Sequence, residues 1–163
     1  MRKINLLIIL IGTVLVLSGC VGQDNSGLAV DKLTIQVTDL NQINRALANG
    51  PVLLETGAKW CPPCRKQGTI INSLAGEYKG KATVMNIDTE ESPVLSNYFN
   101  IDYMPDLCVI VGIENGQYVY MARDGTVSRQ REDARFIGLT DKQTLSNTLD
   151  YAIEEYYNKY RYN

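Results

Sequence analysis

The sequence predicts a single α/β domain built on a mixed β-sheet that helices cover on both faces. Two observations carry this prediction. Short, nearly continuous apolar runs, typical of strands buried on both faces of a sheet, recur along the chain. Segments with helical spacing of apolar residues lie between them, and this alternation indicates an α/β architecture. The 163 residues suffice for one domain, and we find neither an internal repeat nor a second domain.

The first predicted elements follow in order from residue 33. Residues 33–37 alternate apolar and polar side chains, which indicates an edge strand. Residues 38–49 are predicted to form a helix that begins at a Thr-Asp cap and ends at an Asn-Gly pair. Residues 51–56 are a short apolar run and predict a buried strand, and the apolar spacing within residues 63–78 is again helical.

Two more strands and a short helix come next. Residues 82–88 predict a second buried strand, and residues 104–113 predict a third. A helix is expected to begin between them at Pro93, because Ser92 can cap it and proline is favoured at the first helical position.

The last third of the chain is rich in turns. An Asn-Gly pair at 115–116 and an Asp-Gly pair at 124–125 predict tight turns that flank a strand at 118–122. After a charged run, a short last strand is expected at 134–137. The final helix should begin with Thr140 as its cap. The predicted order is β-α-β, followed by α-β-α-β-β-α.

Composition excludes several classes of function. The 16 basic and 18 acidic residues leave a net charge of −2, which gives no reason to expect a nucleic-acid partner. The chain has no histidine, so Ser-His-Asp catalysis, Cys-His catalysis and every histidine-containing metal site are ruled out. Any chemistry must therefore use cysteine, carboxylate, lysine, arginine or tyrosine.

The N-terminal segment has the layout of an export signal. Residues 1–19 contain two basic residues, an apolar run too short to span a membrane comfortably, and small residues at the end. Residues 17–20, Leu-Ser-Gly-Cys, resemble the lipobox of prokaryotic lipoproteins, in which the cysteine is lipidated and becomes the first mature residue. We therefore expect a lipoprotein signal peptide at 1–19 and lipidation at Cys20.

The predicted chain after the signal peptide has two parts. Residues 20–32 comprise the lipidated cysteine and a polar, flexible tether, and residues 33–163 form the domain. The alternative is an uncleaved signal anchor with Cys20 as an unmodified thiol. Both alternatives place the domain outside the cytoplasm and tether it to a membrane.

A pair of cysteines, Cys61 and Cys64, follows the predicted strand at 51–56 and allows three interpretations. A metal site is disfavoured, because it normally needs four ligands and only Cys20 and Cys108 remain as further thiols. A structural bridge can form in an oxidising compartment, but so short a loop constrains little of the unfolded chain. A redox pair fits best, because Cys61 falls where a strand ends and a helix begins, and helix N-termini stabilise thiolates.

In the redox interpretation, Cys61 is the attacking thiol. Cys64, one turn into the helix, is expected to be more shielded and to resolve the mixed disulfide. Pro63 occupies a first-turn position that needs no N–H, and Pro62 stiffens the loop. Cys108 lies in an apolar strand and is expected to be a buried, unreactive residue.

The motif Trp-Cys-Pro-Pro-Cys at 60–64, followed by Arg65, resembles the active site of the thioredoxin family. The resemblance extends over about residues 35–156. It implies the thioredoxin fold, with an added hairpin near 117–133.

The same resemblance implies roles for residues around the dithiol. Glu55 holds the place of a buried carboxyl, which can move the proton of the resolving thiol. Met104-Pro105 matches the cis-proline dipeptide of the family, in which the backbone of the residue before proline pairs with the substrate chain. Trp60 and Pro62 complete the predicted substrate-binding surface.

Departures from the family pattern concern the choice of partner and the redox direction. Pro62 replaces a glycine, Thr-Gly at 56–57 replaces an aromatic pair, and Gly-Thr at 68–69 stands where a helix-kinking proline is usual. Glu55 replaces the aspartate of cytosolic thioredoxins, and a glutamate there is similar to exported, membrane-tethered members of the TlpA-like group.

The resemblance implies a membrane-anchored, extracytoplasmic thiol–disulfide oxidoreductase that reduces disulfides of exported proteins. No metal or organic cofactor is expected, because electrons pass by exchange with a partner dithiol. The expected partners are exported proteins with disulfides and, as reductant, a membrane electron-transfer protein. Two alternatives stay open: a disulfide oxidase or isomerase that uses the same residues, and a surface binding module whose dithiol is a static bridge.

Overall fold

The computed structural model describes residues 32–161 of the chain. The predicted signal peptide at 1–19, the lipidation site Cys20 and all but the last residue of the predicted tether lie outside these residues and remain predictions. Within residues 32–161, no helix is both long and apolar enough to cross a membrane.

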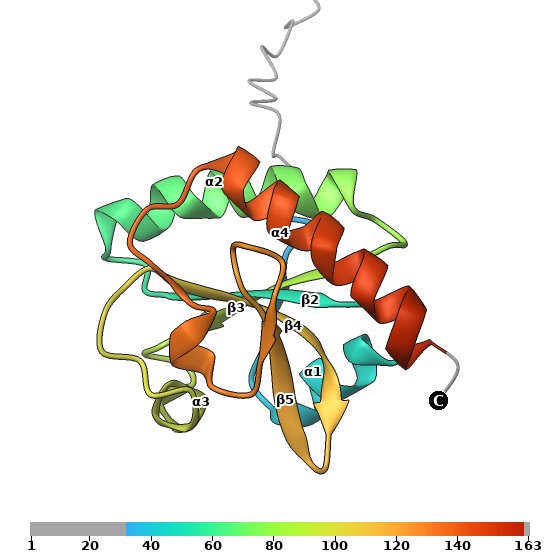
Figure 1. The fold of residues 1–163 in the computed structure, drawn as a ribbon. Helices are drawn as coiled ribbons and strands as arrows, with labels where there is room; N and C mark the ends of the chain where they lie inside the picture. Colours follow the sequence, from blue (N-terminus) through green and yellow to red (C-terminus); the bar gives the residue numbers. More distant parts are fainter. Residues whose placement is uncertain (1–31, 162–163) are drawn as a thin grey trace, which may run out of the picture. The chain divides into compact units, whose positions relative to one another are not determined.

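One mixed sheet runs through the described residues, with strand order β1-β3-β2-β4-β5-β6 and with β7 paired to β4 (Figure 1). β1 and β2 both pair with β3 in parallel, and the other pairings are antiparallel. The strands are β1 (Ile35–Gln36), β2 (Val52–Gly57), β3 (Thr83–Asp88), β4 (Asp106–Glu114), β5 (Gln117–Met121), β6 (Val127–Ser128) and β7 (Phe136–Ile137). The predicted mixed sheet is confirmed. The predicted strands and helices follow one another as expected, and the structure adds the short strand β6 between the strands expected at 118–122 and 134–137.

Helices cover both faces of this sheet, with α2 and α4 on one face and α1 and α3 on the other (Figure 1). The helices are α1 (Leu40–Leu47), α2 (Pro62–Glu77), α3 (Pro93–Tyr98) and α4 (Lys142–Glu155). A π-helical turn, Tyr156–Tyr160, extends α4. The architecture is the thioredoxin fold that the resemblance implied.

Two apolar layers, one on each face of the sheet, explain the continuous apolar runs of the strands. In β2, Leu53 packs in the layer of α2 and α4, whereas its neighbour Leu54 packs in the layer of α1 and α3. β4 repeats this pattern with Val109 and Cys108. Successive strand residues point to opposite faces, so a strand covered on both faces is apolar at nearly every position. Burial also raises the pKa of the Cys108 thiol, which agrees with an unreactive core residue.

Asp39 fixes the beginning of α1. Its carboxylate accepts the Asn41 backbone N–H at 2.6 Å, and the Gln42 side-chain carbonyl accepts the Asp39 backbone N–H at 3.0 Å. This reciprocal pair is a capping box, which satisfies N–H groups that the first helical turn leaves unpaired.

Replacing Asp39 with alanine is expected to lower the free energy of unfolding by about 1 kcal/mol, because the helix loses its capping oxygen. Urea unfolding of the variant and the wild type measures the loss. Asp39→Ser is the matched control, since serine caps helices about as well as aspartate. Equal losses in the two variants would contradict the capping role.

The cap predicted for α4 is wrong, and the cap predicted for α3 is correctly placed but makes no side-chain capping bond. α4 is capped by Asp141 and not by Thr140. The Thr140 backbone N–H instead donates to the side-chain carbonyl of the buried Gln67 on α2, at 2.8 Å. Ser92 precedes α3 as predicted, but its hydroxyl donates to the Val37 carbonyl oxygen at 3.3 Å and makes no capping bond.

The added segment at 117–133 forms a hairpin. β4 and β5 meet at the Asn-Gly pair of residues 115–116, where both residues have positive φ, at 52° and 77°. Tight hairpin turns of this kind favour Asn-Gly for that reason. β5 and β6 then form the added hairpin, as predicted, whereas the expected strand at 134–137 shortens to the two residues of β7.

Arg131 ties this added segment to the centre of the sheet. Its buried guanidinium pairs with the carboxylate of the fully buried Asp106 and donates to the Phe99 carbonyl oxygen at 3.2 Å. Arg135 also approaches the same carboxylate, with its Nη1 atom 3.5 Å from Asp106 Oδ2. Asp106 directly follows Pro105, so the ion pair anchors the added segment beside the predicted substrate-docking loop.

Candidate active site

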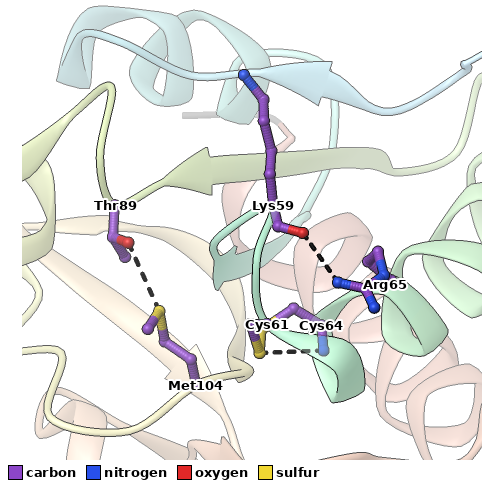
Figure 2. Close-up of a disulfide and its surroundings, with 6 residues drawn as sticks. All are labelled: Lys59, Cys61, Cys64, Arg65, Thr89 and Met104. Carbon is purple, nitrogen blue, oxygen red and sulfur yellow. Dashed lines mark hydrogen bonds between the residues drawn. A yellow bond between two sulfur atoms is a disulfide. The ribbon is translucent and has the colours of Figure 1, made fainter.

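Cys61 lies at the junction of β2 and α2. It is the N-cap residue of α2, and its sulfur accepts the Cys64 backbone N–H at 3.2 Å (Figure 2). Pro62 and Pro63 occupy the first helical positions, where no intrahelical N–H is needed. The Cys61 sulfur is therefore held at the positive end of the helix dipole, which stabilises a thiolate.

Cys61 and Cys64 form a disulfide, with their Cα atoms 5.2 Å apart. They pack with Ala58 and Met104 in a small cluster separate from the two main layers. The two cysteines are 4% and 6% exposed, so the greater shielding predicted for Cys64 is not observed in this disulfide form. The N-cap position of Cys61, and not its exposure, favours it over Cys64 as the attacking thiol, and that role stays a prediction.

The loop before the dithiol is held by contacts on both sides. The Arg65 Nη1 atom donates to the Lys59 carbonyl oxygen at 3.1 Å (Figure 2). The Lys59 side chain pairs with the Glu91 carboxylate. Trp60, between Lys59 and Cys61, is 61% exposed, which leaves its ring available to a partner protein.

Glu55 lies buried in β2, behind the dithiol. Burial raises the pKa of its carboxyl to about 7, and the nearby Asp88 charge adds to this rise while Lys32 opposes it. A Cβ built on Gly57 would stand 2.7 Å from Glu55 Oε1 and 3.1 Å from Cys64 Sγ, so both atoms border one small space. A carboxyl that titrates near neutral pH beside a thiol can accept and return the thiol's proton.

The Met104–Pro105 peptide bond is cis, as the resemblance implied. Met104 packs against the dithiol cluster, and the Thr89 hydroxyl donates to its sulfur at 3.6 Å (Figure 2). The Pro105 carbonyl oxygen accepts the Gly138 backbone N–H at 2.8 Å. These contacts place the predicted docking residue next to the cysteines, and its pairing with a substrate chain stays a prediction.

Gly57 and Asp88 also belong to this site, although sequence patterns assign neither of them a role. They are paired neighbours on the parallel strands β2 and β3. Asp88 was partly predictable, because it ends an apolar strand that lies beside the strand of Glu55, and the carboxyl ends of parallel strands meet at one edge of a sheet. The close approach of the Glu55 and Cys64 side chains to Gly57 depends on how α2 packs on β2, and no local sequence pattern predicts that packing.

The fold and the dithiol together define a class: the chain is a thiol–disulfide oxidoreductase. The sequence pattern of the family described as "Thioredoxin" matches residues 34–149. The chain therefore belongs to the thioredoxin family.

Individual relatives agree with this assignment. "Thioredoxin 1" of Nostoc sp. is 32% identical over 116 residues, which span 71% of this chain and 92% of the relative. "Thioredoxin" of Staphylococcus haemolyticus is 33% identical over 116 residues, which span 71% of this chain and 94% of the relative. The solved structure of Trichomonas vaginalis thioredoxin has a TM-score of 0.57 at 19% identity and covers 74% of this chain and 98% of that chain. At this identity the solved structure supports the fold alone.

Proposed function

We propose that this protein is a membrane-anchored, extracytoplasmic thioredoxin of the TlpA-like type that reduces disulfides in exported proteins. The observation that carries the redox part of this proposal is the arrangement of three groups. Cys61 caps α2, Cys64 is bonded to it, and the Glu55 carboxyl borders the same small space beside Gly57 as the Cys64 sulfur. A static bridge has no use for a titrating carboxyl beside one of its sulfurs, whereas a cycling dithiol must move a proton at that atom.

In the proposed reaction, the Cys61 thiolate of the reduced protein attacks a substrate disulfide. One substrate sulfur joins Cys61 in a mixed disulfide, and the other leaves as a thiolate that takes a proton from solvent. Cys64 then gives its proton to the Glu55 carboxylate and attacks the Cys61 sulfur, which releases the second substrate sulfur. Two electrons pass to the substrate, and the protein is left with the Cys61–Cys64 disulfide.

The substrate chain is proposed to dock beside the dithiol on exposed and backbone groups. Trp60 and Pro62 are exposed there, and Met104 packs against the cysteines from the other side. A β-type contact with the Met104 backbone would bind many sequences, because main-chain hydrogen bonds do not depend on the side chain.

The location is proposed from the N-terminal sequence. Residues 1–19 have the layout of an export signal, and the lipobox-like end supports a lipid anchor at Cys20. Disulfides persist in extracytoplasmic compartments, which are oxidising. A reductase there needs electrons from elsewhere, so we propose a membrane electron-transfer protein as its reductant.

Trapping in the native host tests this proposal. The full-length Cys64→Ser variant should accumulate mixed disulfides with exported proteins in the membrane fraction, because the resolving thiol is missing. The Cys61→Ser/Cys64→Ser variant is the matched control and should trap none. Adding Cys20→Ser should move the protein out of the membrane fraction. A lack of adducts favours the binding module, and an unchanged membrane fraction contradicts the lipid anchor.

The free energy of unfolding should depend on pH, because the Glu55 carboxyl has a different pKa in the folded and the unfolded protein. The pKa of this carboxyl rises from the ordinary 4.5 to about 7 on folding, so between these values the folded state keeps a proton that the unfolded state has released. The stabilisation is therefore complete below pH 4.5 and is lost as the pH rises through 7. The expected loss is about 3 kcal/mol, because each pKa unit corresponds to about 1.4 kcal/mol.

Urea unfolding of the oxidised protein at about pH 4 and about pH 8 measures this effect. Glu55→Gln should remove about 3 kcal/mol of the loss in unfolding free energy between the two pH values, because the amide does not titrate. Glu90→Gln, at an exposed position, controls for the loss of one acidic side chain. The assignment is wrong if Glu55→Gln keeps the full pH dependence of the wild type.

A further inference from the structure

The backbone does not require glycine at position 57. Gly57 is the last residue of β2 and pairs with Asp88 of β3. Its carbonyl oxygen accepts the Thr89 backbone N–H at 2.9 Å. Its φ is not among the positive values found at other glycines of residues 32–161. An added side chain would therefore disturb the space around Gly57 and not its conformation.

That space is already filled by the redox site. A Cβ on Gly57 would stand 2.7 Å from Glu55 Oε1, 3.0 Å from Cys64 Cβ and 3.1 Å from Cys64 Sγ. Real Cβ atoms essentially never approach another heavy atom closer than 3.0 Å, so one of these groups would have to move. Even alanine is too large at this position without a rearrangement.

The Glu55 side chain is the group that can move. Cys64 is held within α2, and the β2 backbone is paired on both sides, with β3 and with β4. Glu55 and Gly57 are two residues apart in one strand, so both face the same side of the sheet. The Glu55 carboxyl lies at the end of three rotatable bonds, and a methyl group at position 57 would turn it away from the sulfur.

We propose that Gly57 is a positioning residue for proton transfer: because it has no side chain, it leaves the room through which the Glu55 carboxyl reaches the Cys64 sulfur. This inference rests on the proposed role of Glu55 in the resolving step. A proton acceptor has to lie within one hydrogen bond, or one bridging water, of the proton that it takes. Turning the carboxyl away therefore slows the attack of Cys64 without changing either sulfur.

The length of the carboxyl side chain at position 55 allows a second test of this proposal. Aspartate is one methylene shorter than glutamate and needs less of the shared space. Gly57→Ala should therefore be harmful beside Glu55 and better tolerated beside aspartate. A purely structural defect at position 57 would not depend on the length of the carboxyl side chain in this way.

Stopped-flow mixing of the reduced full-length protein with equimolar 5,5′-dithiobis(2-nitrobenzoate) tests the proposal. Attack by Cys61 releases the first coloured thiolate, and attack by Cys64 on the resulting mixed disulfide releases the second. The rates of both phases are measured across about pH 5–9 for the wild type and for Glu55→Gln, Glu55→Asp, Gly57→Ala and Glu55→Asp/Gly57→Ala.

The variants are expected to change only the second phase, in which Cys64 attacks the mixed disulfide. In the wild type its rate should rise through about pH 7, where Glu55 titrates. Gly57→Ala should slow this phase at least about tenfold and remove the inflection, as Glu55→Gln does, because general base catalysis is worth at least that much. The first phase should stay unchanged. Glu55→Asp/Gly57→Ala should regain the inflection and most of the rate.

Different failures have different meanings. If Glu55→Gln removes the inflection but Gly57→Ala keeps both rate and inflection, Gly57 has no positioning role and the role of Glu55 stands. If Glu55→Gln itself leaves the second phase unchanged, both the role of Glu55 and this inference are overturned. If Gly57→Ala does not fold, the double variant must fold and show the inflection, and its failure to do so overturns the inference.

Discussion

Replacing Cys61 with serine is expected to reduce the rate of protein-disulfide reduction to that of the buffer alone. The variant lacks the sulfur that caps α2 and that we propose opens the substrate disulfide, and serine cannot form the mixed disulfide. Cys64→Ser should behave differently, because it retains the attacking thiol. It should form one stoichiometric adduct with a disulfide-containing test protein and then stop.

Mass spectrometry of the adducts and a turnover assay with dithiothreitol as reductant separate the two variants. Cys108→Ala is the control for the loss of a thiol, since Cys108 is the free cysteine of residues 32–161 and lies in the apolar layer of α1 and α3. It should turn over like the wild type. Turnover by Cys61→Ser, or a stable adduct on Cys61→Ser in place of Cys64→Ser, would contradict the assigned order of attack.

Replacing Asp106 with leucine is expected to lower the free energy of unfolding by about 3–5 kcal/mol, because the change leaves the buried Arg131 guanidinium without its carboxylate. The Phe99 carbonyl oxygen still accepts one N–H of this group, but a carbonyl does not neutralise its charge. The added segment at 117–133 should be the first part of the sheet to open.

The double variant Asp106→Leu/Arg131→Met is the matched control. Replacing both partners of a buried ion pair by apolar side chains of similar size is often neutral, so most of the lost stability should return. Urea unfolding of the wild type, both single variants and the double variant completes the thermodynamic cycle. A double variant no more stable than Asp106→Leu would show that the ion pair is not the cause of the loss.

The spacing of apolar residues predicted the order of the elements well. The strands and helices of this fold bury fixed faces in regular layers, and such burial produces a regular apolar pattern in the sequence. The sequence predicted the polar contacts less well. Thr140 and Asp141 are both suitable caps, but the Asp141 carboxylate accepts the Thr144 backbone N–H, whereas the Thr140 hydroxyl donates to the Gly138 carbonyl oxygen. The Ser92 hydroxyl donates to the Val37 carbonyl oxygen, 55 residues away, in place of a capping bond. A partner so distant in the chain leaves no local sequence pattern.

The candidate active site also combines features that the sequence predicts with a contact that depends on tertiary structure. The cysteines, Glu55 and the cis bond at Met104–Pro105 could be inferred, because a short motif and a family resemblance contain them. The relation between Glu55 and Gly57 could not, since it depends on a distance of a few ångströms between β2 and α2. The expected difference in shielding between Cys61 and Cys64 is absent, since both residues are buried in the disulfide form.

The reduction potential of the Cys61–Cys64 couple tests the proposed reductive exchange most directly. It is measured by equilibrating the full-length protein with dithiothreitol or glutathione buffers of known ratio and quantifying the free thiols. A reductase should give a potential of about −270 mV, that of thioredoxin. A potential of about −120 mV, that of a strong disulfide oxidant, or a disulfide that does not exchange with the buffer at all, would contradict it.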